Sequence, residues 1–371
     1  MGILKKAKEL FERKNDIVGQ HIELKVCMMG PRAVGKTTIL TSIFHDADRK
    51  TNSSRIYFNP ANDLTRDILE RGESQLSQMF REIPDEKNAL LPGIASSDIT
   101  EFRFKLGLKG GTGKKDKNSS VDVVITDFPG EYVEETHVEH HKVVSFIKES
   151  QVIMLAIDTV HLLEAGGKYN EARNRSQYMC EKISQILKRL SPEDRKLILL
   201  VPLKCEKYVL NKQQSQMDAA VASAYSMLIH DIETNYKSQI GVFITPIQTI
   251  GSVVFDNFER DKSGEIILDM MDNNCPRKAN FKFYRVFPDR KPVYMPAYCI
   301  QPLYYLIAFA LEQYKYQQNH GGAISVFFKG VFGLFSSDLQ FKEACRYFIA
   351  NNIITSGNGF VTINNPKLIT Q

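Results

Sequence analysis

The sequence contains no closely spaced cysteine pair of the kind that zinc sites or redox centres use. Zinc sites and disulfide frameworks show characteristic short spacings between cysteines. The 371 residues include six scattered cysteines and no C-x-x-C pair, the six being Cys27, Cys180, Cys205, Cys275, Cys299 and Cys345. Neither kind of site is therefore supported, and a reducing, cytoplasmic compartment is the simplest expectation.

Long apolar runs are also absent. No run approaches the ~18 residues that a membrane-spanning helix needs. The first 20 residues show no apolar stretch followed by a cleavage site. We therefore expect neither secretion nor a membrane span.

The chain lacks a strong excess of charge of either sign. It has 48 Lys and Arg against 43 Asp and Glu, and a formal net charge of +5. A mild excess of this size does not indicate specific nucleic-acid binding. The hydrophobic content of 43% is typical of a globular protein with a substantial core.

Short apolar runs alternate with helical patterns along most of the chain. Such runs occur at residues 22–29, 152–158, 197–201 and 240–245. Continuous apolar strands separated by helices predict a mostly parallel sheet with helices on both faces. The alternating residues 102–108 predict one antiparallel strand, which we expect to pair with the run VDVVITD at residues 121–127.

Two polar regions interrupt this pattern and predict large loop insertions, near residues 46–98 and 253–296. The second has six basic residues between Arg277 and Lys291. We therefore expect an N-terminal helix over residues 1–20, a nucleotide-binding domain over residues 21–319 and a C-terminal extension over residues 320–371.

A phosphate-binding motif follows the first predicted strand. Residues 30–38 read GPRAVGKTT and satisfy G-x-x-x-x-G-K-[ST] between a strand and a helix. Backbone N–H groups of such a loop surround phosphate oxygens, its lysine reaches the β- and γ-phosphates, and the next hydroxyl binds Mg²⁺. The predicted nucleotide contacts are Gly30, Pro31, Arg32, Ala33, Val34, Gly35, Lys36, Thr37 and Thr38.

A second motif, DFPG, ends the predicted strand at residues 121–127. Asp127 is suited to a Mg²⁺ contact and the N–H of Gly130 to the γ-phosphate. An aspartate at a strand end is common by itself. Its order and spacing relative to the phosphate loop make the prediction specific.

Together, GPRAVGKTT, the antiparallel strand pair and DFPG resemble the translation-factor-related class of P-loop GTPases. The long insertions, DFPGE and the late pattern Pro296, Gln301, Pro302, Leu303 are similar to bacterial double-GTPase domains. The resemblance covers residues ~22 to ~316 and implies an α/β P-loop fold, binding of GTP or GDP with Mg²⁺, and switch segments. It also suggests a bacterial conflict or regulatory system.

Base recognition departs from the family pattern. Where the family has [NT]-K-x-D, this chain reads Leu203-Lys204-Cys205-Glu206. The resemblance implies that Lys204 and Glu206 meet the guanine base, with the Glu206 carboxylate one methylene further from the backbone than an aspartate. A surface Lys–Glu pair after a buried strand is the alternative.

Two further residues are candidate switch elements. The resemblance places Glu131 where relatives orient the attacking water, but a carboxylate beside the γ-phosphate also repels negative charge, so slow intrinsic hydrolysis is expected. The alternative is that Glu131 points away from the nucleotide and only caps the following helix. Ser96, Ser97 and Thr100 are candidates for the first-switch Mg²⁺ ligand, and Thr100 is preferred because it lies closest to the strand.

Two segments are candidates for contact with a partner or a membrane surface. Residues 2–14 read as a basic amphipathic helix, and residues 323–335 are rich in Phe. Packing against the domain is the simpler interpretation of each.

The sequence thus predicts a GTP-hydrolysing molecular switch that is slow without an unidentified protein effector or activating partner. A weakly hydrolysing scaffold at a partner or membrane surface is an alternative from another class. A P-loop ATPase is a third, favoured by the altered base motif.

Overall fold

The computed structural model describes most of the predicted nucleotide-binding domain. The described residues are 23–52, 54–83, 85–91, 98–109, 120–133, 137–270, 272–320, 339–350 and 352–369. The predicted N-terminal helix, the Phe-rich residues 323–335, Ser96 and Ser97 lie outside them, as does the side chain of Glu131. Within the described part, no helix is long and apolar enough to cross a membrane.

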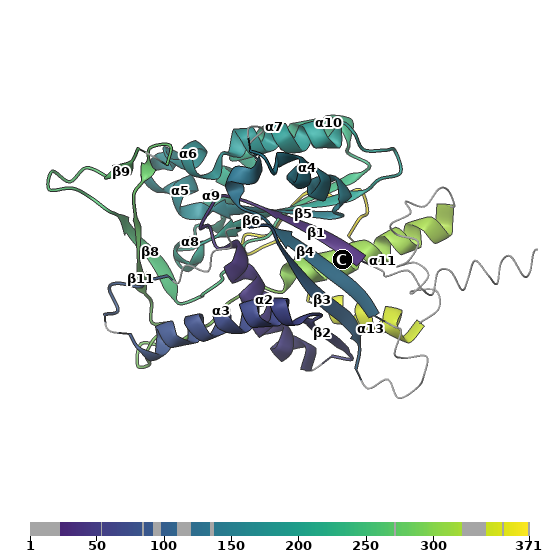
Figure 1. The fold of residues 1–371 in the computed structure, drawn as a ribbon, viewed down its shortest axis with the longest axis horizontal. Coiled ribbons are helices and arrows are strands. Elements are labelled where there is room, and N and C mark those ends of the chain that lie inside the picture. The colour runs from purple at the N-terminus through teal and green to yellow at the C-terminus, as the bar shows by residue number, and fades with distance from the viewer. Residues whose placement is uncertain are drawn as a thin grey trace, which may run out of the picture.

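A mixed sheet forms the centre of the molecule (Figure 1). Eight strands of the described residues join it in the order β12-β7-β6-β5-β1-β4-β3-β2. Strands β1, β4, β5, β6 and β7 run parallel, whereas β3 is antiparallel to β4 and β2 is antiparallel to β3. The bounds are β1 Glu23–Met29, β2 Ile56–Pro60, β3 Thr100–Leu108, β4 Ser120–Asp127, β5 Val152–Asp158, β6 Lys196–Leu203, β7 Ile240–Ile244 and β12 Val361–Asn364.

Strand composition explains this arrangement. Every residue of β5 and β6 is buried, as expected for central parallel strands covered on both faces. In β3, Phe102, Phe104 and Leu106 are buried while Lys105 is exposed, so the alternating pattern corresponds to one buried face. The predicted fold class is confirmed, including the antiparallel pairing of this strand with residues 121–127.

Helices cover both faces of the sheet. One apolar core contains buried residues of α2, α11 and α13, and a second contains those of α4, α7, α9 and α10. The bounds are α2 Lys36–Asn52, α3 Asp63–Arg81, α4 His140–Glu149, α5 Thr159–Leu163, α6 Asn170–Asn174, α7 Ser176–Leu187, α8 Glu206–Leu210, α9 Gln214–Ala224, α10 Ser226–Asn235, α11 Gln301–His320 and α13 Leu339–Ile349. The connections within the described residues include the 3₁₀ helices η2 Gly130–Val133 and η3 Glu164–Gly167.

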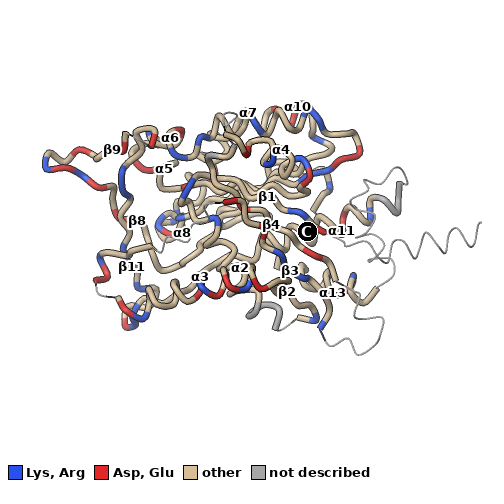
Figure 2. The backbone as a smooth tube through the Cα atoms, in the orientation of Figure 1, with Lys and Arg blue, Asp and Glu red and all other residues tan. Residues whose placement is uncertain are grey.

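The two predicted insertions pack together around a third apolar core. Helix α3, from the first insertion, contributes Leu76, and the second contributes Phe255, Phe258, Phe281 and Phe283. The second insertion forms the pairs β8 Val253–Phe258 with β11 Ala279–Phe283, and β9 Leu268–Asp269 with β10 Cys275–Pro276. Figure 2 shows acidic and basic residues interspersed along this region.

Several basic residues of the second insertion form ion pairs within the chain. Lys282 pairs with Asp256, Arg277 with Glu259 and Arg285 with Glu86. Much of the local positive charge is therefore neutralised. Three of the six basic residues noted in the sequence are therefore paired within the insertions.

The C-terminal residues contribute a strand that the sequence analysis does not predict. Strand β12 pairs antiparallel with β7 at the sheet edge. Buried Gln301 of α11 also connects to this region, because Nε2 donates to Asn352 O at 2.7 Å and Oε1 accepts from Ile354 N at 3.0 Å. The predicted domain boundary at residue 320 stays a prediction.

We expect Gln301→Ala to lower the free energy of unfolding by about 1–3 kcal/mol, because it leaves a backbone donor and a backbone acceptor without their partner. Urea denaturation measures this change. The control is Gln177→Ala, since that exposed side chain bonds only within its own region, to Glu181. Equal stability of the two variants would show that the Gln301 contacts do not hold the C-terminal residues in place.

Candidate functional site

The motif at residues 30–37 forms a tight loop between β1 and α2. Gly30 and Gly35 have φ values of +147° and +110°, and Ala33 has a φ of +55°. A Cβ at Gly30 would stand only 2.6 Å from the carbonyl oxygen of Ala156 in β5. Glycine is therefore required at the end of β1 both for its backbone conformation and for this close approach.

Lys36 and Thr37 begin α2 and meet Asp127 at the end of β4. Thr37 Oγ1 donates to Asp127 Oδ2 at 3.2 Å, and Lys36 Nζ lies 3.8 Å from Asp127 Oδ1. All three residues are buried. Strands β1 and β4 are parallel neighbours, so their carboxyl ends place the two sequence motifs side by side.

The Asp127 carboxylate has properties that suit a metal contact. Burial raises its pKa, while the Lys36 ammonium and the Thr37 hydroxyl act in the opposite direction. Oδ1 is buried and accepts no geometrically good hydrogen bond from any described residue. An under-satisfied buried carboxylate oxygen beside a threonine hydroxyl fits Mg²⁺, which prefers oxygen ligands and retains several waters. The described residues contain no cluster of three or more His, Cys, Asp or Glu for a metal.

Gly130 lies directly against the phosphate loop. A Cβ at this position would stand 2.8 Å from Gly30 O and 3.3 Å from Arg32 N. Only glycine fits without displacing the loop, so the DFPG motif is pressed onto residues 30–32. Glu131 follows in η2, and its proposed part in hydrolysis stays a prediction.

Thr100 is placed close to the same carboxylate by strand register. It is the first residue of β3, and its Cα partner in β4 is Asp127. Its Oγ1 bonds to Asp98 O at 3.3 Å. The antiparallel pairing therefore brings the preferred first-switch residue to the correct end of the sheet, and its role as a Mg²⁺ ligand stays a prediction.

The two candidate base-binding residues differ in their surroundings. Lys204 has a φ of +55°, and its Nζ bonds to Ala33 O at 3.3 Å. Glu206 is buried at the start of α8, where Oε1 accepts from the N–H groups of Ile250 and Gly251, each at 3.3 Å. Burial raises the pKa of the Glu206 carboxyl, against the effect of these donors. One oxygen of Glu206 thus braces the loop after β7, so the surface Lys–Glu pair alternative does not describe this residue.

The sequence analysis misses a second buried carboxylate, Asp158, at the end of β5. Asp158 is fully buried and bonds to Lys204 Nζ at 2.7 Å and to His161 Nδ1 at 2.9 Å. Arg173 Nε lies 3.7 Å from the same carboxylate. Burial alone would raise the pKa of Asp158, but the cations, with Lys204 foremost, hold it well below its usual range. Its position at the end of an apolar strand next to β1 is a signal that could have identified it.

Cationic side chains bind four consecutive carbonyl groups of the phosphate loop. Lys36 Nζ donates to Gly30 O at 3.2 Å and to Pro31 O at 3.4 Å. Arg173 Nη2 donates to Arg32 O at 2.7 Å, and Lys204 donates to Ala33 O as described above. These cations bind either Asp127 or Asp158, so two buried carboxylates hold the loop through three cations. Fixed carbonyls limit how the N–H groups of the same peptides can reorient, which favours a preformed anion site.

The fold and this site define a P-loop nucleotide-binding domain of the GTPase type. The family model described as Double-GTPase 2 matches residues 25–241, and the chain belongs to that family. Family membership supports a GTP-binding domain. No curated protein matches the chain.

Solved structures give distant matches at 12% sequence identity. A signal recognition particle receptor SRb-GTP/SRX complex from Chaetomium thermophilum matches 62% of this chain and 93% of that chain, with a TM-score of 0.34. The S. cerevisiae Ski7 GTPase-like domain bound to GTP matches 63% of this chain and 45% of that chain, with a TM-score of 0.33. The same domain bound to GDP and inorganic phosphate has the same coverage and a TM-score of 0.35.

We expect Asp158→Asn to lower the free energy of unfolding at pH 7 by about 3–5 kcal/mol, because it leaves the partly buried Lys204 and Arg173 without their buried counter-charge. The folded-state pKa of Asp158 is depressed, so its contribution is fully present above its unfolded pKa of ~3.9. The contribution is lost as the pH falls through the folded pKa. The difference in the free energy of unfolding between wild type and Asp158→Asn should therefore become smaller only below about pH 4.

Denaturant titrations between pH 7 and pH 3 measure this difference. Asp63→Asn is the control, because Asp63 is exposed and pairs only with Arg66 one helical turn away. A difference that is absent at pH 7, or that is the same for Asp63→Asn, would show that Asp158 is not the anchor of the loop cations.

Proposed function

We propose that this chain is a Mg²⁺-dependent GTP-binding protein that hydrolyses GTP and acts as a nucleotide-dependent switch. The observation that carries the proposal is the convergence of Lys36, Thr37 and Asp127, from two motifs separated by about 90 residues, at one buried point. These are the groups that phosphate and Mg²⁺ binding require. Family membership supports guanine as the base.

The site residues divide the binding of phosphates, Mg²⁺ and base among them in this proposal. Lys36 and the loop N–H groups bind the β- and γ-phosphates, and Gly130 senses the γ-phosphate. Thr37 and Asp127 would hold Mg²⁺, with Thr100 as the first-switch ligand, and a bound ion would neutralise charge on the phosphate oxygens. Lys204 and the second oxygen of Glu206 serve base recognition.

The proposal also assigns the control of hydrolysis, the domain bounds and the contacts with partners. Glu131 makes hydrolysis slow until a protein effector or activating partner acts. Residues 21–319 are the GTPase domain, and residues 2–14 and 323–335 are candidate contacts for a partner or membrane. A role in a bacterial conflict or regulatory system also stays a proposal.

Lys36→Ala should reduce Mg²⁺-nucleotide affinity by at least ~100-fold, since it removes the cation that contacts the phosphates. Titration with a fluorescent GTP analogue, followed by fluorescence anisotropy, measures the affinity. A thermal melt shows whether the variant is folded. Lys25→Ala is the matched control, because Lys25 is in β1 and pairs with Glu149 away from the loop. Unchanged affinity in a folded Lys36→Ala protein would remove the central proposal.

We expect GTP to bind at least ~100-fold more tightly than ATP, because buried polar groups discriminate strongly between bases. Glu206→Gln should remove most of this preference by weakening GTP binding and leaving ATP unchanged. The amide retains an acceptor for Ile250 and Gly251, so the variant isolates the charge and the second oxygen. Titration with GTP and ATP, followed by phosphate release under multiple turnover, gives both affinity and hydrolysis.

The outcomes distinguish the three functions. Selective GTP binding with turnover supports the switch GTPase. Equal or ATP-biased binding would instead support the ATPase, and tight GTP binding without turnover would support the scaffold. Glu131→Gln then shows whether the carboxylate restrains hydrolysis.

A further inference from the structure

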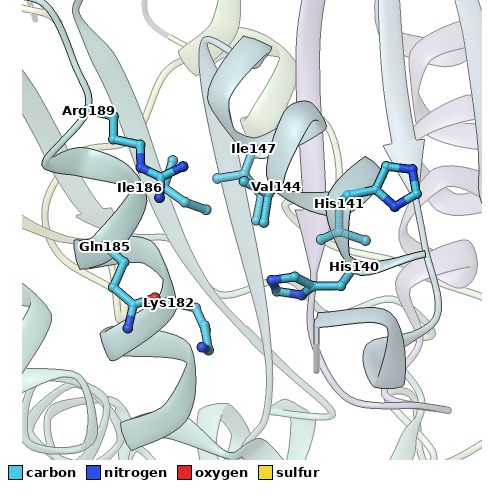
Figure 3. Close-up of a pocket in the computed structure, with 9 residues that line it drawn as sticks. His140, His141, Val144, Ile147, Lys182, Gln185, Ile186 and Arg189 are labelled. Carbon is cyan, nitrogen blue, oxygen red and sulfur yellow. The ribbon is translucent and has the colours of Figure 1, made fainter. Parts of the chain in front are cut away.

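A cavity of about 340 Å³ lies between α4 and α7, outside the nucleotide site. Its apolar lining consists of Val143, Val144 and Ile147 from α4 and Ile186 from α7. Figure 3 shows side chains of both helices around the space between them. We refer to this feature as the α4–α7 groove.

The polar residues of the groove are cationic or neutral. They are His140 and His141 from α4, and Lys182, Gln185 and Arg189 from α7 and the residues after it. No aspartate or glutamate lines it. The acidic residues of the same region have other partners, since Glu139 pairs with Lys142 and Glu149 with Lys25. The groove therefore offers positive charge beside an apolar surface.

His140 lines the groove at the start of α4. Its Nδ1 atom is buried and has no hydrogen-bond partner among the described residues. In Figure 3 the His140 ring extends into the space between the helices, toward Lys182. The His140 ring therefore forms part of the groove wall, with its Nδ1 atom closed off from solvent.

The dimensions suit a helix. At 1.5 Å per residue, the lining residues of α4, from His140 to Ile147, extend about 10 Å, which matches about two turns of a helix lying along them. Helix-in-groove recognition uses apolar residues at i, i+3, i+4 and i+7 against an apolar surface. Acidic residues flanking that stripe would meet Lys182, Arg189 and the histidines.

The chain's own terminal segments have the wrong charge for this site. Residues 2–14 carry five basic residues and two acidic ones, and residues 323–335 carry one lysine and no acid. We propose that the α4–α7 groove is a docking site for an amphipathic helix of a partner protein, with acidic residues on both sides of its apolar stripe. This proposal is independent of nucleotide hydrolysis.

A library of displayed helical peptides tests the proposal with the full chain. The peptides share a fixed leucine stripe, and their flanking positions vary among Glu, Gln and Lys. We expect the selected peptides to be enriched in Glu at the flanks. Fluorescence anisotropy with the selected peptides should then show at least ~10-fold weaker binding to Arg189→Glu and to Gln185→Glu.

Lys188→Glu is the matched control, because Lys188 is exposed, adjacent in sequence and outside the groove lining. It makes the same charge change, so it should leave affinity within about twofold. Thermal melts confirm that all three surface variants are folded. Val144→Asp, which places charge on the apolar surface, should abolish binding.

Three outcomes would overturn the proposal. The selection could yield no helical peptide that binds, or it could yield binding peptides that are not enriched in Glu. The third is an equal loss of peptide affinity in Arg189→Glu and Lys188→Glu. Vesicles containing phosphatidylserine are a further probe. Vesicle binding that depends on Arg189, in a protein that selects no peptide, would assign the groove to a membrane surface instead.

Discussion

Burial of two carboxylates on either side of β1 is the constraint on which the site depends. Asp127 ends β4 and Asp158 ends β5, and these strands are the two neighbours of β1 in the sheet. A buried carboxylate is costly unless cations and hydrogen bonds compensate it. Here the compensating cations also reach the loop that follows β1, so the electrostatic requirement of the core fixes the backbone of the phosphate site.

Sheet topology explains why the site lies at this edge. The carboxyl ends of parallel strands meet at one edge, so β1, β4, β5 and β6 all deliver their following residues there. Strand β3 runs in the opposite direction, and its first residue, Thr100, is therefore found at the same edge. Gly30 and Gly130 then allow the loop and the DFPG motif to approach more closely than any side chain would permit.

Much of this arrangement could be predicted because its signals are local. The phosphate loop is one continuous motif, and Asp127 is recognisable from its strand and from the spacing to Gly130. Asp158 shows the same strand-end signal but no accompanying motif, so it was missed. Arg173 could not be found from sequence, because the carbonyl that it contacts is 141 residues earlier in the chain. Its short helix α6 also follows η3, in which Ala165 and Gly166 have left-handed backbone conformations. The buried position of Glu206 likewise depends on backbone groups more than 40 residues along the chain.

The second insertion is joined to the nucleotide site through the same residues. Asp272 lies 3.5 Å from Arg173 Nη1, the Lys204 ammonium lies 5.9 Å from the centre of the Phe281 ring, and Glu206 braces the loop that leads into β8. Arg173 and Lys204 each bind a carbonyl of the phosphate loop, and Lys204 and Glu206 belong to the base motif. A displacement of the insertion would change the environment of each of them at once. The departure of LKCE from the family pattern is therefore best understood together with the insertion, because the longer Glu206 side chain reaches the backbone of Ile250 and Gly251, which immediately precede it.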